Sequence, residues 1–164
     1  ATVRTAQEAG PSNVVGIVRD FVADGCGLAD QQAGYAMLFN ILHVENPLGL
    51  LQEAYRVLVP RGEVGMIHWR SDIETPRGPS PEIRPTAEQC RAWGEQVGFE
   101  FLRYEPLCCC SWHWGLVMRR RTGLEFDFAQ DEIGEFAGPD RGAAVALGEI
   151  LCRPGEAAVD HHGA

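Results

Sequence analysis

The chain has 164 residues, of which 45% are hydrophobic and 23% are charged, as in a globular domain with a single core. The net charge of −9 argues against nucleic acid as a partner, because bulk electrostatics would repel its phosphates. No apolar run reaches the length of a membrane span, and no stretch has the pattern of a secretion signal, so we expect a cytoplasmic protein with no membrane partner.

Two residue types narrow the possible chemistry. Every basic side chain is an arginine, which excludes Schiff-base chemistry on a lysine. The six cysteines include three in a row at 108–110 and form no CxxC pair, so we expect reduced, mostly buried thiols and no metal. The alternative is a metal site formed by Cys110, His113, His161 and His162.

Helices and strands alternate in the first part of the chain. A helix is predicted over 2–9 and a short β-branched strand over 13–18. Residues 34–42 are almost continuously apolar, as in a strand buried on both faces of a parallel sheet. Apolar residues at helical spacing predict a helix over 46–58, with Pro47 in its first turn.

The same alternation continues to residue 120. A strand is predicted over 63–69, and a helix over 86–99 that opens at Thr86 and closes at Gly98. Two further strands are predicted over 99–107 and 111–120. Alternating strands and helices predict an α/β fold, with a parallel sheet that carries helices on both faces.

Polar side chains follow three of these strands. Asp20 comes after the first, Asn40 and His43 after the second, and His68 and Arg70 at the end of the third. Ligands of doubly wound sheets bind at the carboxyl ends of the strands, so these residues predict a site there.

Several motifs resemble class I S-adenosylmethionine-dependent methyltransferases. The block "LLQEAYRVLVPRGE" is similar to a common signature of that superfamily, with Arg61 in place of the first glycine of the turn. The segments "LFNILH", "IHW", "TPRGP", "IRP" and "WHWGLV" resemble one bacterial subfamily of small-molecule type. The resemblance covers roughly residues 1–120. It implies a Rossmann-like fold with an antiparallel C-terminal hairpin, S-adenosylmethionine as cofactor and a small-molecule methyl acceptor.

The resemblance also implies where the cofactor binds. Asp20 matches the acid that accepts a hydrogen bond from the adenine amino group, and Phe21 matches the residue that meets the adenine ring. The strand end that faces the methionine moiety is matched by Leu38, Phe39 and Asn40.

The acceptor side follows from the same resemblance. His43 and His68 are the candidate catalytic residues, because a neutral imidazole can take a proton near pH 7. The substrate pocket would be bordered by Arg70, Arg77, Arg84 and His113, since arginine can orient an anionic group.

Each of these residues also has a structural interpretation. Asp20 could cap a turn, and His43 could form a hydrogen bond at the helix entry. His68 could be a half-buried structural imidazole. Arg77 and Arg84, each beside a proline, could fasten their loop.

The glycine-rich cofactor loop of the superfamily, and the acid that ends its second strand, should precede residue 1. Without the first strands, the segment 34–42 would form a bare sheet edge. One explanation is a longer parent chain, and another is a homodimer that pairs edge to edge. In a third, residues 123–151, which read as strand, glycine-containing loop and helix, supply the missing strand.

We therefore expect a partial methyltransferase domain at 1–121 and an acidic extension at 122–164, weakly ordered or packing on the sheet. The predicted function is methyl transfer to a small molecule. The alternative is a catalytically silent remnant that serves as an interaction or dimerisation module. We also expect a homodimer that forms through the "YAMLF" strand.

Overall fold

The computed structural model describes residues 17–108, 110–122 and 144–148. In chain order the elements are α2 (Phe21–Asp24), β1 (Ala33–Phe39), α3 (Pro47–Val57), β2 (Leu58–Trp69), η1 (Pro81–Ile83), α4 (Ala87–Val97), β3 (Phe99–Glu105), β4 (His113–Arg120) and β5 (Ala144–Gly148). The helix predicted over 2–9 lies outside these residues. Of the strand predicted over 13–18, only Ile17 and Val18 are described, and both are exposed and outside any strand.

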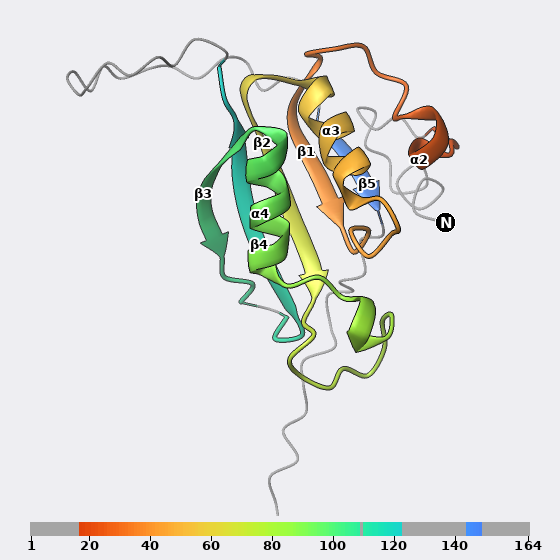
Figure 1. The fold of residues 1–164 in the computed structure, drawn as a ribbon, viewed down its shortest axis with the longest axis vertical. Helices are drawn as coiled ribbons and strands as arrows, with labels where there is room; N and C mark the ends of the chain where they lie inside the picture. Colours follow the sequence, from red (N-terminus) through yellow and green to blue (C-terminus); the bar gives the residue numbers. More distant parts are fainter. Residues whose placement is uncertain (1–16, 109, 123–143, 149–164) are drawn as a thin grey trace, which may run out of the picture.

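The strands form one mixed sheet in the order β3-β4-β2-β1-β5 (Figure 1). β1 runs parallel to β2 and to β5, whereas β4 is antiparallel to both β2 and β3. The predicted parallel sheet is thus limited to the β2-β1-β5 side. None of the described helices is long and apolar enough to cross a membrane.

β1 has a neighbour along both of its edges. β2 pairs with one edge, and β5 pairs with the other from Tyr35↔Ala144 to Phe39↔Gly148. Of the three explanations for the edge at 34–42, the structure supports the one in which the acidic extension supplies the missing strand, because residues 144–148 pair with β1 there. The helix predicted for this part of the extension is wrong, since residues 144–148 form a strand.

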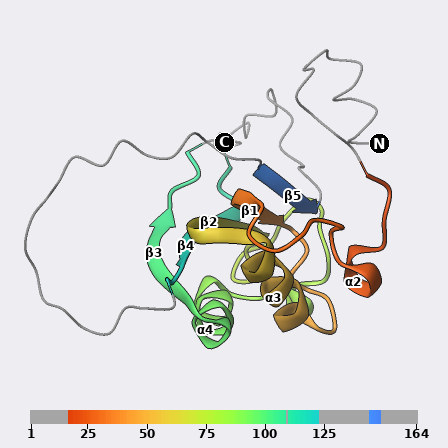
Figure 2. The ribbon, with the colours of Figure 1, turned by 90° about the horizontal axis from the view of Figure 1, so that it is seen from above.

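Helices α3 and α4 both cover the same face of the sheet (Figure 2), whereas the sequence predicts helices on both faces. Each helix connects two strands that point in the same direction, and both connections move toward the β3 edge. Because such crossovers are right-handed, two that move the same way lie on the same face. The core fills the space between this face and the helices, with fully buried side chains that include Leu38, Leu51, Val64, Met66, Leu116 and Met118.

The ends of both helices carry the signals expected from the sequence. Asn46 caps α3 by accepting a hydrogen bond from the Gly49 amide at 3.1 Å. Thr86 and Gln89 form a reciprocal capping box at the start of α4. Gly98 ends α4 with φ of 115°, a left-handed conformation that favours glycine.

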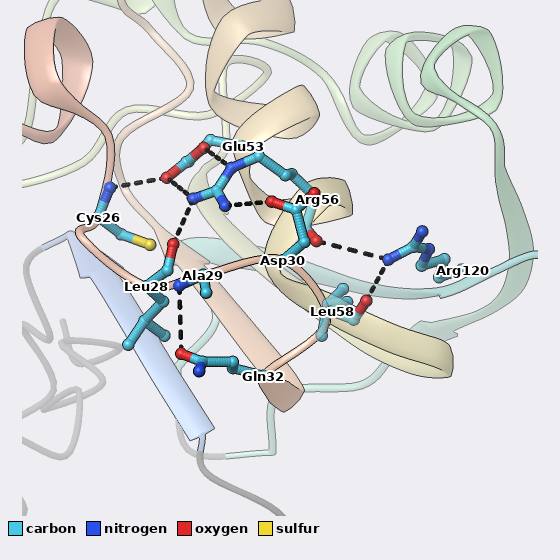
Figure 3. A network of polar contacts seen from close by, with 9 residues as sticks. All are labelled: Cys26, Leu28, Ala29, Asp30, Gln32, Glu53, Arg56, Leu58 and Arg120. Carbon is cyan, nitrogen blue, oxygen red and sulfur yellow. Dashed lines mark hydrogen bonds and ion pairs between the residues drawn. The ribbon is translucent and has the colours of Figure 1, made fainter.

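A charged network ties the segment before β1 to helix α3 (Figure 3). Arg56 donates two hydrogen bonds of 2.8 Å to the Glu53 carboxylate, one from Nε and one from Nη2. It also pairs with Asp30 at 2.6 Å and donates to the Leu28 carbonyl at 2.7 Å. Glu53 in turn accepts the Cys26 amide at 2.8 Å. The network therefore fixes how the chain enters β1.

The Arg56 guanidinium lowers the pKa of Glu53 from 4.5 to about 2, with a further contribution from the Cys26 amide. The Glu53 side chain is 15% exposed and that of Arg56 is 36% exposed, so solvent screens part of this interaction. A lowered pKa in the folded state stabilises the protein above pH 4.5, and this stabilisation is lost as the pH falls towards 2.

We expect Glu53→Gln to lower the free energy of unfolding at pH 7 by about 1.5–3 kcal/mol, the usual worth of hydrogen bonds to a charged group. The difference between the variant and wild type should shrink between pH 4.5 and pH 2, because wild-type Glu53 becomes protonated there. Urea unfolding at several pH values measures both effects. Glu100→Gln, at an exposed position of β3, is the control and should change stability little. A pH-independent difference would contradict this account.

Deletion of residues 123–164 removes β5 and should leave the β1 edge unpaired. We expect the shortened protein to self-associate at micromolar concentration, because an unpaired strand edge recruits another strand. Sedimentation velocity measures this. Deletion of 149–164 alone keeps β5 and serves as the control. A monomer of the 1–122 chain would show that β5 does not protect this edge.

Candidate active site

Two histidines meet at the carboxyl ends of β1 and β2. His43 lies between the end of β1 and the start of α3, and His68 is the penultimate residue of β2. His43 Nδ1 and His68 Nε2 are 3.2 Å apart, and the two rings meet edge to face with their centroids at 5.3 Å. The structure thus brings together the two residues predicted to be catalytic.

His68 is fully buried. Its ring stacks on Trp114 with centroids 6.1 Å apart, and its Nδ1 lies 3.5 Å from the Trp69 carbonyl oxygen. Burial is the largest cause that lowers the pKa of His68 to about 4. Burial also lowers the pKa of His43, which is half-buried. Both imidazoles are therefore neutral at pH 7.

Asn40 stands at the same sheet end, directly after β1. Its φ of 53° is left-handed, a conformation that asparagine tolerates better than most residues. Its amide donates to the Ile67 carbonyl at 2.8 Å, which joins it to β2. The buried Oδ1 has no hydrogen-bond partner in the part of the chain that the structure describes. A buried acceptor without a protein partner is usually satisfied by a water, an ion or a ligand.

His113 lies on the other face of the sheet from His68. Consecutive strand residues point to opposite faces, so Trp69 faces away from His68 and packs against His113 with ring centroids 3.9 Å apart. Cys110 Sγ lies 2.8 Å from His113 Nδ1, and His113 Nε2 is buried without a partner among the described residues. Burial lowers the pKa of His113, and the charges of Arg77 and Arg84 lower it further. The structure therefore associates Arg77, whose side chain is exposed, with His113 rather than with the histidine pair.

The loop after β2 is held down on Trp69. Gly78, at φ of 110°, lies against the indole, where a Cβ would come within 3.0 Å of the ring. Arg84 is only 7% exposed and donates to the Pro79 carbonyl at 2.8 Å and the Arg70 carbonyl at 2.7 Å. Arg70 itself is partly exposed and pairs with Asp72 at 2.6 Å. The hydrogen bonds of Arg84 are those of a residue that fastens this loop.

The residues predicted to bind the adenine and methionine parts of the cofactor lie in different surroundings. Asp20 is exposed, and its Oδ1 accepts from the Val22 and Ala23 amides at 3.1 Å each, which caps the short helix α2. Phe21 packs against the edge of the core. Leu38 is fully buried in the core, whereas Phe39 is half-buried.

Some features of the structure have a sequence signal and others have none. The stacking of Trp114 on His68 could be inferred from the alternation "WHW", once the pairing of β4 with β2 is known. The unpaired oxygen of Asn40 has no sequence signal. The Glu53–Arg56 pair does have one, the spacing of three residues on a helix.

Among residues 17–108, 110–122 and 144–148, no group of three or more possible ligands could hold a metal ion. Cys110 and His113 form a pair only, and His161 and His162 lie outside the described residues. Of the described cysteines, Cys90 is buried, and burial raises the pKa of its thiol to about 12. The prediction of mostly buried thiols is wrong for Cys108, which is exposed, and holds only in part for Cys26 and Cys110.

We expect Arg84→Met to destabilise the protein by about 1–3 kcal/mol, because it leaves two carbonyl acceptors of the loop without a donor. Amide hydrogen exchange over residues 71–79 should also become faster. Urea unfolding and exchange measurements test both effects. Arg70→Met removes an exposed ion pair of the same loop and should change stability little. Equal effects of the two substitutions would contradict the fastening role of Arg84.

Solved structures that this chain resembles include several S-adenosylmethionine-dependent methyltransferases. One from Aquifex aeolicus matches with a TM-score of 0.61 at 20% identity, over 71% of this chain and 60% of that chain. One from Mesorhizobium loti matches with a TM-score of 0.54 at 15% identity, over 71% and 74% of the two chains. The [4+2]-cyclase SpnF also matches, with a TM-score of 0.58 at 18% identity, over 73% and 61%.

No family model matches the sequence, and no curated protein matches it. The chain spans about 60% of the length of the Aquifex aeolicus structure. At these identities the similarity establishes the fold. The described residues form a mixed α/β sheet that resembles part of the class I methyltransferase fold.

Proposed function

We propose that this chain transfers a methyl group from S-adenosylmethionine to a small-molecule acceptor. The observation that supports it is the carboxyl end of β1 and β2, where the unpaired oxygen of Asn40 and the His43–His68 pair occur on a methyltransferase-like fold. Ligands of such sheets bind at this edge.

The residues at this edge fit the cofactor. Among the described residues no group donates to the buried Asn40 Oδ1, and the ammonium of a methionine moiety would supply a donor. The half-buried Phe39 beside it offers apolar contact. Asp20 lies apart from this edge, before α2 in the chain, and it would accept a hydrogen bond from the adenine amino group while it caps α2.

When bound, S-adenosylmethionine supplies an electrophilic methyl group on a sulfonium sulfur. The chain contributes positioning and a base. His43 and His68 are neutral at pH 7, because burial lowers the pKa of each, so the pair can take the proton that the acceptor loses. The loop held by Arg84 borders the same end of β2, where it helps to shape the edge of the site.

The alternative is a catalytically silent remnant that serves as an interaction or dimerisation module. The activity of a whole methyltransferase does not carry over directly, since the chain spans about 60% of the Aquifex aeolicus structure. The match to a [4+2]-cyclase favours this alternative, because it shows that proteins with this fold do not all catalyse the same reaction.

Calorimetric titration with S-adenosylmethionine and S-adenosylhomocysteine separates the two functions. We expect saturable binding in the micromolar range together with a raised melting temperature, since a ligand that binds the folded state stabilises it. Absence of both heat and thermal shift would overturn the proposed enzyme and favour the remnant.

Two substitutions test the binding residues in the same titration. Asp20→Asn keeps a capping acceptor but loses the carboxylate charge, and it should weaken binding by about tenfold, the equivalent of about 1.4 kcal/mol. Asn40→Gly removes the unpaired oxygen and tolerates the positive φ, and it should weaken binding similarly. Asp24→Asn, on the same exposed helix, is the control and should bind like wild type. Unchanged binding by Asp20→Asn would show that the adenine assignment is wrong.

A further inference from the structure

The contact between His43 and His68 requires one proton between two ring nitrogens. A neutral imidazole carries a hydrogen on one nitrogen and a lone pair on the other. His43 Nδ1 and His68 Nε2 are 3.2 Å apart, so one of them must donate and the other must accept. Which nitrogen carries the hydrogen decides what the free nitrogen of His43 can do.

The Trp69 carbonyl determines the direction of this hydrogen bond. His68 is fully buried, and its Nδ1 faces the Trp69 oxygen at 3.5 Å. A carbonyl oxygen can only accept, so a hydrogen on His68 Nδ1 gives both groups a partner. A lone pair there would instead place two acceptors face to face in a fully buried position, which is costly. His68 therefore carries its hydrogen on Nδ1 and accepts through Nε2.

The tautomer of His68 also fixes the tautomer of His43. Because His68 Nε2 accepts, His43 Nδ1 must donate, and the lone pair of His43 is on Nε2. We infer that His68 is a positioning residue that holds His43 in the tautomer whose Nε2 can take a proton. This inference deepens the proposed methyl transfer, for which it identifies His43 as the base and His68 as its support.

The surroundings of the pair keep it neutral but ready to accept one proton. His43, His113 and Arg84 are the ionisable groups whose charges act on His68, and each disfavours a positive charge on it. Trp114 covers the ring of His68 and offers no acceptor. A proton taken up by the pair is therefore directed to His43, which is less buried than His68.

The proton transfer then balances in a simple way. The hydrogen leaves the heteroatom of the methyl acceptor and binds the lone pair of His43 Nε2, while the electrons of the broken bond stay on the heteroatom. The imidazolium of His43 still donates from Nδ1 to His68 Nε2, so its charge is stabilised by a hydrogen bond that already exists. Water can later remove the proton from the same nitrogen.

Nitrogen NMR of the histidine side chains in the ligand-free protein tests this inference directly. At pH 7 we expect both His43 and His68 to carry their hydrogen on Nδ1. In His68→Phe, which keeps an aromatic ring against Trp114 but has no acceptor, His43 should lose this preference and its pKa should fall. In His68→Gln, whose amide oxygen can replace Nε2 as acceptor, the Nδ1–H tautomer of His43 should be retained.

The tautomer of His113, on the other face of the sheet, should stay the same in all variants and serves as the control. A hydrogen on His43 Nε2 in wild type would overturn the inference, even if no variant folds. An unchanged His43 in folded His68→Phe would also overturn it. These measurements need no cofactor, so they are independent of the calorimetric test. They can therefore show that His68 does not fix the tautomer of His43 even if the chain binds S-adenosylmethionine, and the reverse.

Discussion

The parallel register between β1 and β2 is the constraint on which the site depends. It pairs Phe39, the last residue of β1, with Ile67, so that β2 extends only two residues beyond the end of β1. Asn40 then reaches the Ile67 carbonyl, and the chain that follows brings His43 to His68. The Glu53–Arg56 network supports this register from the other end, because it fixes the segment that leads into β1.

Much of the fold is predictable from local sequence patterns. The apolar run 34–42, the helical spacing at 46–58 and the capping residues at 86–99 each specify one element, and the structure forms all three. The strand at 144–148 was misjudged because a short apolar run reads equally well as strand or helix. Its pairing with β1 decides the outcome, and that contact is distant in sequence. The face of the sheet that the helices cover depends on the order of the strands, and local sequence patterns do not specify that order.

The candidate site was predictable in position but not in detail. Polar residues after apolar strands identify the sheet end, and the structure brings His43 and His68 together there. The alternation of the strand separates His68 from His113, although sequence reasoning had placed both near one pocket. The proline beside Arg84 suggested a loop-fastening role as one alternative, and the structure shows the two hydrogen bonds that perform it. The unpaired oxygen of Asn40 depends on tertiary packing, so no local pattern could reveal it.

The long separation between β1 and β5 has a consequence during protein synthesis. β1 ends at Phe39, but its second neighbour begins only at Ala144. A ribosome adds about 5–20 residues per second, so one edge of β1 stays open for about 5–20 s after the strand itself has been made. During that time neighbouring nascent chains on the same messenger RNA could pair with it, and chaperones that shield strand edges would raise the yield of correctly folded protein.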